Sequence, residues 1–281
     1  MSTKPQHPEF LYGTAWKEEK TKELTFLALS KGFRGIDTAN QRKHYHEIAV
    51  GEAIREAVKG GVVNREELFV QTKYTFQRGQ DHLLPYDPAA SITEQVRQSW
   101  QSSEEHLGRI DSFLLHGPSR REGLGPEDLE AWRAIAKLQE DGEVSYLGVS
   151  NVSAEQLEEF CRVGPAPNFV QNRCYARFGW DAKVRKGCSK RGVVYQGFAL
   201  LKANITELED PRVARIARKR AWTGPQLIFR FALEKGWLPL TGTTDPNHMV
   251  EDLSVIEKSL TDEEISTIES VGLDSEGDRN C

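Results

Sequence analysis

Three ionisable side chains, Asp37, Lys73 and His116, each stand at the end of a short apolar stretch of the chain. A carboxylate and an ammonium can form an ion pair, and an imidazole beside them can give or take a proton near neutral pH. Taken one at a time, such an aspartate is often a helix cap and such a lysine is usually solvated. Their occurrence at the ends of neighbouring strand-like segments favours a shared catalytic site in which protons move to or from a bound molecule.

The elements that would position these side chains are short strands alternating with longer amphipathic segments, the pattern of repeated strand–helix units around a parallel sheet. The predicted strands are residues 10–13, 32–37, 67–72, 110–116, 144–149, 168–172, 193–196 and 237–241. The predicted helices are residues 17–31, 46–59, 91–107, 127–141, 153–163, 180–191, 223–235, 246–258 and 261–271. Predicted helix starts are Ser91, Ser153 with Gln156 three residues on, and the capping box of Thr261 and Glu264.

Eight strands, each followed by a helix and with no linker between them, predict an α/β fold: a single (β/α)8 TIM barrel with one or two extra C-terminal helices, in one domain over residues 1–281. No Gly-x-Gly-x-x-Gly sequence opens a predicted helix, which argues against a doubly wound dinucleotide fold. A barrel carries its chemistry at the carboxyl ends of the strands, where all three ionisable residues stand. The irregular residues 74–90 follow the third strand, and we expect either a substrate lid or a surface insertion there.

The composition is that of a globular chain with an acidic balance. The 281 residues carry a formal net charge of −5, with a mean hydropathy of −0.56. Nucleic-acid binding depends on clustered Lys and Arg, so we expect no nucleic-acid partner. The chain has no apolar leader and no long apolar run, which predicts a cytoplasmic protein without a membrane span. No heptad seam or long unpaired apolar strand is evident, so the expected state, a monomer or a simple homo-oligomer, stays undetermined. Its four cysteines lack zinc-like spacing, and we expect them to be reduced and no metal to be bound.

Several segments resemble the aldo-keto reductase family. Residues 32–39, Gly-Phe-Arg-Gly-Ile-Asp-Thr-Ala, precede residues 45–54, Tyr-His-Glu-Ile-Ala-Val-Gly-Glu-Ala-Ile, and together they resemble the family's strand-end aspartate, tyrosine and Glu-x-x-Val-Gly-x-Ala-Ile helix. Further similar segments, in the family's order, are Gln71-Thr72-Lys73, Leu115-His116, Gly148-Val149-Ser150-Asn151, Val170-Gln171-Asn172 and residues 225–233. The similarity runs from Gly13 to about residue 258. It implies an NADP-dependent oxidoreductase that reduces an aldehyde or ketone to an alcohol.

The resemblance implies a catalytic tetrad of Asp37, Tyr45, Lys73 and His116. A carbonyl that accepts hydride develops alkoxide charge, and a positioned acid must donate a proton as that charge forms. Tyr45 is the implied acid. A free phenol has a pKa of about 10, and we expect the nearby ammonium of Lys73 to lower the pKa of Tyr45. Asp37 would keep Lys73 charged, and a neutral His116 would orient the substrate oxygen.

The loop before Tyr45 departs from the usual family pattern. More residues separate Asp37 from Tyr45 than is usual, so residues 40–44 hold a short insertion. Counting back from Glu47 by the common spacing arrives at His44. Two assignments therefore stay open: Tyr45 as the acid, which we favour because no other tyrosine lies near this loop, or His44 as the acid with Tyr45 in the core.

The resemblance also implies a nicotinamide cofactor extended across the barrel mouth. Ser150, Asn151 and Gln171 resemble the polar set that holds the carboxamide, and Tyr195 resembles the aromatic residue that stacks on the nicotinamide ring. Ser150-Asn151 can instead be read as a turn and helix cap before Glu155. The other implied cofactor contacts are Thr14, Trp16, Gly242, Thr243, Thr244, His248 and Asp252.

The cofactor phosphates are expected near the start of the helix at Pro246, where unpaired backbone N–H groups favour anions. Many family members grip the 2′-phosphate with Lys-Ser and a following arginine, which this chain lacks, and Thr243, Thr244 and His248 remain. We favour NADPH over NADH from the resemblance alone. Asp252 either meets the adenine edge or is an exposed helix carboxylate.

The substrate is expected to be a small carbonyl compound that the sequence does not name. The predicted pocket is apolar, although each aromatic residue has an equal claim to a place in the core. Its predicted lining residues are Trp16, His44, Phe76, Phe178, Trp180 and Phe198. Two other functions stay open: a catalytically silent nicotinamide-binding sensor or regulatory subunit on the same barrel, and an imine-forming lyase that uses Lys73. The presence of all four ionisable types favours the reductase.

Overall fold

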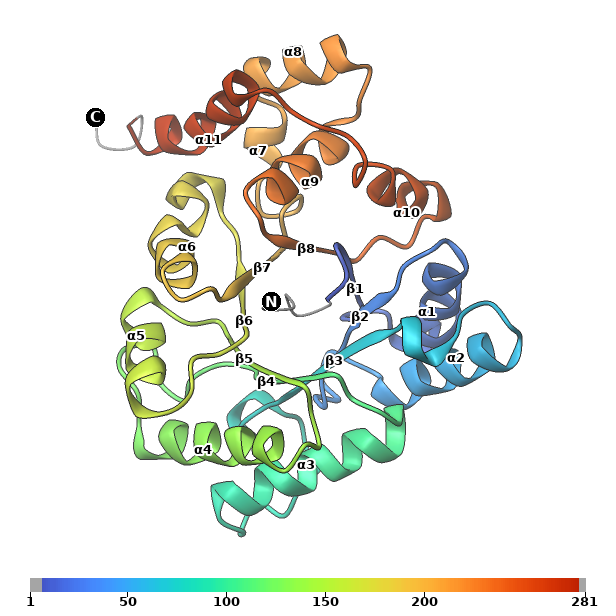
Figure 1. The fold of residues 1–281 in the computed structure, drawn as a ribbon, viewed down its shortest axis with the longest axis vertical. Coiled ribbons are helices and arrows are strands. Elements are labelled where there is room, and N and C mark those ends of the chain that lie inside the picture. Colours follow the sequence, from blue (N-terminus) through green and yellow to red (C-terminus); the bar gives the residue numbers. More distant parts are fainter. Residues whose placement is uncertain (1–6, 278–281) are drawn as a thin grey trace, which may run out of the picture.

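Eight parallel strands form a closed barrel in chain order in the computed structural model, which describes residues 7–277 (Figure 1). The barrel closes because β1 pairs with both β2 and β8. The strands are β1 (Leu11–Gly13), β2 (Gly35–Asp37), β3 (Phe69–Tyr74), β4 (Ser112–Leu115), β5 (Tyr146–Ser150), β6 (Phe169–Arg173), β7 (Val194–Phe198) and β8 (Leu238–Thr241). The prediction of a TIM barrel is confirmed, with all eight strands close to their expected positions.

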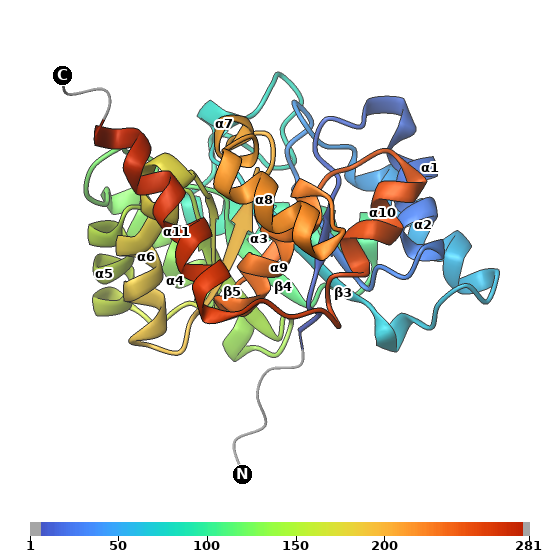
Figure 2. The same cartoon turned by 90° about the horizontal axis from the view of Figure 1, so that it is seen from above.

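Helices surround the ring of strands, as Figure 1 shows. They are α1 (Thr21–Ser30), α2 (Glu47–Lys59), α3 (Ile92–Leu107), α4 (Pro126–Glu140), α5 (Ala154–Val163), α6 (Ala182–Ser189), α7 (Ile205–Leu208), α8 (Pro211–Arg220), α9 (Gly224–Glu234), α10 (Pro246–Leu253) and α11 (Asp262–Gly277). Short 3-10 turns are η1 (Glu18–Lys20), η2 (Arg65–Glu67), η3 (Gln77–Gly79) and η4 (Ala176–Asp181). The extra C-terminal helix α11 crosses the outside of the barrel and contacts η4, α8 and α9 (Figure 2).

Side-chain caps begin the helices where the sequence predicts them. The Ser91 hydroxyl accepts a hydrogen bond from the backbone N–H of the first turn of α3. Ser153 and Gln156 form a reciprocal capping box at α5, and Thr261 and Glu264 form another at α11. These caps satisfy backbone donors that the first turn of a helix otherwise leaves unpaired.

Two helices between β7 and β8 were not predicted. The sequence pattern predicts one helix between these strands, residues 223–235, and the structure has α7 and α8 before it. Asp210 caps α8 and Pro211 occupies its first turn, a pairing that is itself a helix-start signal. It was missed because α8 is rich in arginine and buries only Val213, Ile216 and Ala217.

Strand side chains alternate between the barrel interior and the layer beneath the helices. Four apolar residues fill one end of the interior, Leu11, Phe69, Phe169 and Leu238. Two positions further along their strands, Gln71 and Gln171 face the same interior and join Gln196 in a layer of hydrogen-bonded amides. Because Asp37 and Lys73 continue this alternation, they face the interior just above the amide layer.

Among residues 7–277, no helix is long and apolar enough to cross a membrane.

Candidate active site

Asp37 and Lys73 form a fully buried ion pair at the centre of the barrel mouth. The Lys73 Nζ donates to both Asp37 carboxylate oxygens, at 2.8 Å each, and to the backbone oxygen of Thr38 at 2.7 Å. Gln71 and Gln171 also donate amide N–H bonds to Asp37 Oδ1, at 2.7 and 2.9 Å. The amide layer therefore fixes the carboxylate, and the carboxylate fixes the ammonium.

Two opposing effects act on the pKa of Lys73 in this ion pair. Burial lowers the pKa of Lys73, because an ammonium away from water is disfavoured, while Asp37 works in the opposite direction. All three ammonium hydrogens have acceptors in this arrangement. An amine so engaged is poorly placed to attack a carbonyl, which argues against the imine-forming lyase.

Tyr45 lies beside both Lys73 and His116. The Lys73 Nζ is 5.5 Å from the centre of the Tyr45 ring, and the ring centres of Tyr45 and His116 are 5.9 Å apart in an edge-to-face arrangement. The expectation that Lys73 lowers the pKa of Tyr45 is wrong for this structure. Burial, and then the negative charge of Asp37, raise that pKa above its ordinary value, because Asp37 balances the charge of Lys73.

His116 follows β4 and meets Thr75 from the loop after β3. The Thr75 Oγ1 and the His116 Nδ1 are 2.7 Å apart. Burial, reinforced by Lys73 and His44, lowers the pKa of His116 to about 3. The ring is therefore neutral near pH 7, in agreement with the expectation for a group that orients a substrate oxygen by hydrogen bonding.

His44 packs against Trp16 in the loop before α2. Its ring stacks on Trp16 with centres 3.8 Å apart, and its Nδ1 is buried without a hydrogen-bond partner in the described part of the chain. Burial lowers the pKa of His44. Only Tyr45 of the two candidate acids lies against Lys73, so the geometry favours Tyr45 and gives His44 a place in the wall of the mouth.

A further polar network, which sequence reasoning missed, lies behind Lys73. The buried Glu47, at the start of α2, accepts hydrogen bonds from Thr72 and Ser103 and lies 3.0 Å from His106 Nδ1. Glu47 also acts to raise the pKa of Lys73, though less than Asp37 does. The only available signal was the place of Glu47 in the helix motif after Tyr45, because partners so far along the chain leave no local pattern.

Ser150 and Asn151 stand at the mouth, at the end of β5. The Ser150 hydroxyl donates to the Gln171 backbone oxygen at 2.7 Å. Asn151 has a positive φ of 56°, and its amide donates to the His116 backbone oxygen at 2.8 Å. The alternative of a helix cap is wrong, because Ser153 caps α5. Gln171 differs from expectation in that its amide N–H groups already bond Asp37 and Gln196.

Tyr195 does not face the mouth. Its hydroxyl donates to Asp181 at 2.9 Å and its ring packs against Trp237, in the layer beneath the helices. The prediction that Tyr195 stacks on a nicotinamide ring is therefore wrong, because β7 turns Gln196, not Tyr195, into the barrel. The aromatic side chain of β7 that shares the inward face is Phe198, two residues beyond Gln196.

The segment after β8 differs from expectation at its helix start. Asp245 caps α10 by accepting the backbone N–H groups of Asn247 and His248, so these donors are not free for a phosphate. The backbone oxygen of Thr243 accepts a hydrogen bond from the Tyr12 hydroxyl. The Thr243 hydroxyl accepts a hydrogen bond from the backbone N–H of Asp245. Thr244 and Gly242 complete this loop between β8 and α10.

Asp252 is buried, so its alternative reading as an exposed helix carboxylate is wrong. Burial raises the pKa of Asp252 to about 6, and its Oδ2 has no hydrogen-bond partner among the described residues. The Thr14 side chain is buried too and donates to the Asp37 backbone oxygen. Thr14 therefore holds the end of β2 and has no donor left for a cofactor.

Lys17 is a buried cation that sequence reasoning missed. Its Nζ donates to the backbone oxygen of Gly242 and lies 5.5 Å from the centre of the Tyr12 ring. Burial lowers the pKa of Lys17 to about 8. A lone lysine after a strand has no distinctive pattern, yet here it places a positive charge against the loop where the sequence lacks the expected arginine.

The predicted aromatic pocket divides into two groups. Trp16 and Phe178 are exposed, at 68% and 60%, and Phe198 is partly exposed. Phe76 and Trp180 are buried, so their prediction as pocket residues is wrong: Phe76 packs on Tyr74 and Trp180 on Phe231.

The irregular segment after β3 is tied to its neighbours. Tyr86 donates to the Thr75 backbone oxygen at 2.8 Å, and Gln80 donates to the Asn40 backbone oxygen, also at 2.8 Å. Gln41 donates to the Gly79 backbone oxygen at 2.7 Å. These bonds join the loops after β2 and β3, so the segment has the contacts of a fixed wall and not those of a free lid.

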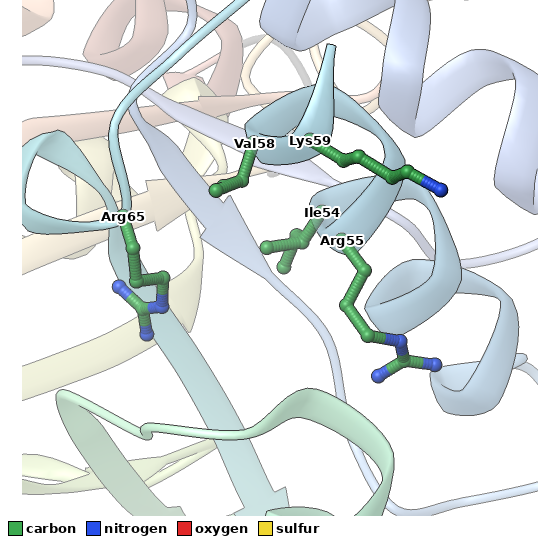
Figure 3. A pocket seen from close by; sticks show the side chains of 5 residues that line it. All are labelled: Ile54, Arg55, Val58, Lys59 and Arg65. Carbon is green, nitrogen blue, oxygen red and sulfur yellow. The ribbon is translucent and has the colours of Figure 1, made fainter. Parts of the chain in front are cut away.

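Other depressions lie away from the mouth. Figure 3 shows one lined by Ile54, Arg55, Val58, Lys59 and Arg65, at the C-terminal end of α2. That end of the helix is next to the amino ends of the strands, opposite the tetrad. Among the side chains that the structure describes, residues 7–271, no group of three or more His, Cys, Asp or Glu could hold a metal ion.

Known proteins similar to this chain share its barrel. The family model described as "Aldo/keto reductase family" matches residues 9–272. "Aldo-keto reductase family 1 member A1" of Gallus gallus is 26% identical, with 91% of this chain and 83% of that protein covered. "Aldo-keto reductase family 1 member C15" of Rattus norvegicus is 28% identical, with 94% and 87% covered. A Bombyx mori aldo-keto reductase solved in complex with NADP has a TM-score of 0.78 at 23% identity, with 94% of this chain and 89% of that chain covered.

Proposed function

The chain belongs to the aldo/keto reductase family, and from this premise we propose that it reduces an aldehyde or ketone to an alcohol with NADPH, Tyr45 acting as the acid. The grouping of Tyr45, Lys73 and His116 at the mouth carries the proposal. An acid, a cation and a neutral imidazole that meet in one place are the groups that a developing alkoxide requires.

Tyr45 enters the reaction as an intact phenol. Its raised pKa keeps the proton on the ring at neutral pH, so the phenol is available as a donor. The dihydronicotinamide, when bound, supplies the hydride. An alkoxide is more basic than a phenolate, so the proton moves from Tyr45 to the substrate oxygen even from a phenol of raised pKa. The Lys73 ammonium, 5.5 Å from the ring centre, lies beside the phenolate that remains and stabilises its charge.

His116 and Asp37 position the reacting groups. With the Thr75 hydroxyl donating to His116 Nδ1, the neutral ring carries its proton on Nε2 and can donate it to the carbonyl oxygen. Asp37 holds Lys73 through two hydrogen bonds of 2.8 Å. The roles are thus divided between a proton donor, an orienting donor and a fixed ion pair.

We propose that the dinucleotide binds across the mouth. Ser150 and Asn151 lie beside His116 for the carboxamide, and Trp16 offers an exposed ring face. At the far side, the Asp252 Oδ2, which has no partner within the described part of the chain, can accept an N–H or O–H from the adenosine half. Lys17 supplies a positive charge near Gly242 for the phosphates. Because Asp245 occupies the backbone N–H groups of Asn247 and His248 at the start of α10, a phosphate can bind these donors only if that carboxylate moves, whereas the exposed side chains of Thr244 and His248 remain available.

The proposal has three further parts. The cofactor is NADPH in place of NADH, the substrate is a small carbonyl compound, and the protein is cytoplasmic. The NADP complex of the Bombyx mori relative supports the first, and the cation at Lys17 agrees with it. A direct comparison of kcat/KM for NADPH and NADH tests this preference. We expect NADPH to have the higher value, and equal values would refute the preference.

The test of the reductase is cofactor oxidation with an aromatic aldehyde by the wild type, Tyr45→Phe and His44→Ala. Removing the phenolic hydroxyl is expected to lower kcat by about a hundredfold or more while the KM for the cofactor stays within a few-fold. His44→Ala is the matched control from the same loop, with an expected loss of less than tenfold. An inactive His44→Ala variant together with a fully active Tyr45→Phe variant would give the acid role to His44. Tight cofactor binding without turnover of any aldehyde would favour the sensor.

A further inference from the structure

The carboxyl ends of β6 and β7 carry two arginines and three aromatic residues that the proposed proton transfer does not use. The Arg173 guanidinium carbon lies 5.1 Å from the centre of the Phe198 ring and 6.0 Å from that of Tyr175. The Arg177 guanidinium carbon lies 4.7 Å from Tyr175 and 5.1 Å from Phe178. We call these five residues the rim cluster. The Tyr175 ring therefore lies 6.0 Å from one guanidinium and 4.7 Å from the other, and both distances are within the range of cation–π attraction.

The rim cluster opens toward the barrel mouth. Phe169 lies in the barrel interior, and Gln171 bonds Asp37 there. Arg173, two residues further along β6, therefore faces the same side. It pairs in register with Phe198, the last residue of β7. The side chains of Arg173 and Phe198 thus lie two residues beyond the Gln171 and Gln196 amides along their strands. They form part of the barrel wall opposite β2 and β3.

Within residues 7–271, whose side chains the structure describes, the rim cluster has no counter-ion: no carboxylate there lies within 4.0 Å of either guanidinium. By contrast, Arg185, Arg220 and Arg230 each contact a glutamate. The Nε of Arg177 is buried and, within the described residues, has no hydrogen-bond partner. A buried donor without an acceptor is costly, and a bound anion would satisfy it.

The backbone beneath the rim cluster is held in a fixed shape. Gly179, Trp180 and Asp181 all have positive φ values, of 65°, 56° and 60°, which is an unfavourable conformation for the two non-glycine residues. Trp180 is fully buried, and Asp181 accepts hydrogen bonds from Asn172 and Tyr195. These anchors hold Arg177 and Phe178 at the mouth before any ligand arrives, which lowers the entropy cost of binding.

We propose that the rim cluster binds a carboxylate carried by the carbonyl substrate, so that the substrates are aldehydes or ketones with an acid group on an apolar or aromatic body. This substrate class rests on the proposed reductase function. A guanidinium can bond both oxygens of a carboxylate, and the faces of Tyr175, Phe178 and Phe198 offer apolar contact beside it. The carbonyl then lies toward Tyr45 and His116, across the mouth.

The first test measures binding without turnover. Calorimetry on the complex with NADP⁺ compares 4-methylbenzoate with 4-methylbenzamide, which has the same shape but no charge. We expect the benzoate to bind at least tenfold more tightly. Arg173→Met and Arg177→Met should each weaken benzoate about tenfold or more and change benzamide less than threefold. Arg173→Lys should retain part of the preference, because it keeps the charge and loses the bidentate geometry.

Arg133→Gln is the matched control, because Arg133 is exposed on α4, on the outside of the barrel; it should change neither affinity. Unchanged benzoate affinity in both methionine variants would overturn the proposal. So would a loss of NADP⁺ affinity with benzoate binding intact, because the arginines would then serve the dinucleotide phosphates.

The second test measures turnover of 4-carboxybenzaldehyde and its neutral analogue methyl 4-formylbenzoate. The wild type should show a kcat/KM at least tenfold higher for the acid, and Arg173→Met should remove that preference while it leaves reduction of the ester nearly unchanged. Equal reduction of both aldehydes by every variant would refute the substrate class and leave the reductase standing. Reduction of neither would refute the reductase, and the calorimetric comparison would still decide whether the rim cluster recognises a carboxylate.

Discussion

Acidification should destabilise this protein through His116. Burial lowers the pKa of His116 from 6.5 to about 3. Between those pH values the His116 ring is protonated in the unfolded chain and neutral in the folded chain. Stability must therefore fall as the pH falls through this window. Between pH 7 and pH 5 the unfolded ring goes from mostly neutral to mostly charged, which corresponds to a loss of about 2 kcal/mol. This figure depends only on the folded ring staying neutral down to about pH 4.

The assay is urea unfolding at pH 7, 6 and 5 for the wild type, His116→Gln and the control His82→Gln, whose side chain is exposed in the loop after β3. His116→Gln should lose about 2 kcal/mol less than the wild type across this range. The contribution of Asp252, whose pKa is raised to about 6, has the opposite sign and cancels between the proteins compared. Parallel curves for the wild type and His116→Gln would show that the pKa of His116 is the same in the folded and unfolded chains, and would refute the claim that burial lowers it.

Four other predictions concern single side chains. Lys73→Met leaves Asp37 charged and unpaired, so it should lower the free energy of unfolding by about 3–5 kcal/mol in urea titrations and abolish aldehyde reduction; a stable, active variant would refute the ion pair's role. Lys17→Met should weaken NADPH binding about tenfold in fluorescence titrations, and an unchanged Kd would exclude a phosphate contact. Asp252→Asn should gain up to about 3 kcal/mol relative to the wild type as the pH rises from 4 to 7, since the raised carboxyl pKa makes the charged form unfavourable in the fold; equal pH profiles would contradict this. Tyr195→Phe should cost about 1–2 kcal/mol in stability with activity kept within twofold, whereas a large loss of kcat would return Tyr195 to the mouth.

The overall architecture was predictable because it rests on local patterns. Eight apolar runs, each followed by an amphipathic segment, indicate a barrel through periodicity alone. Residues at successive strand ends must then meet at one rim, which is why Asp37, Lys73 and His116 were found together. The caps at Ser91 and Ser153 depend on contacts within one helical turn.

The details of the mouth were less predictable because they depend on one-residue choices and on distant partners. A shift of one position on a strand reverses the face, so Tyr195 was expected at the mouth although Gln196 and Phe198 occupy the inner side of β7. The hydrogen bond of Lys17 to Gly242 joins opposite ends of the chain. The cap at Asp245 belongs to an Asp-Pro helix start, a pattern that marks where the helix begins but not which N–H groups the carboxylate occupies.

Two layers close the barrel beneath Asp37. The upper layer is the amides of Gln71, Gln171 and Gln196, and the lower is the apolar group of Leu11, Phe69, Phe169 and Leu238. The Asp37–Lys73 pair is already out of contact with water, at 2% and 0% exposure. A molecule that fills the mouth replaces water above the pair with a less polarisable medium, which lowers the local dielectric and strengthens the attraction between the two charges. The protein's electrostatics at the reaction centre are in this sense completed by its ligand.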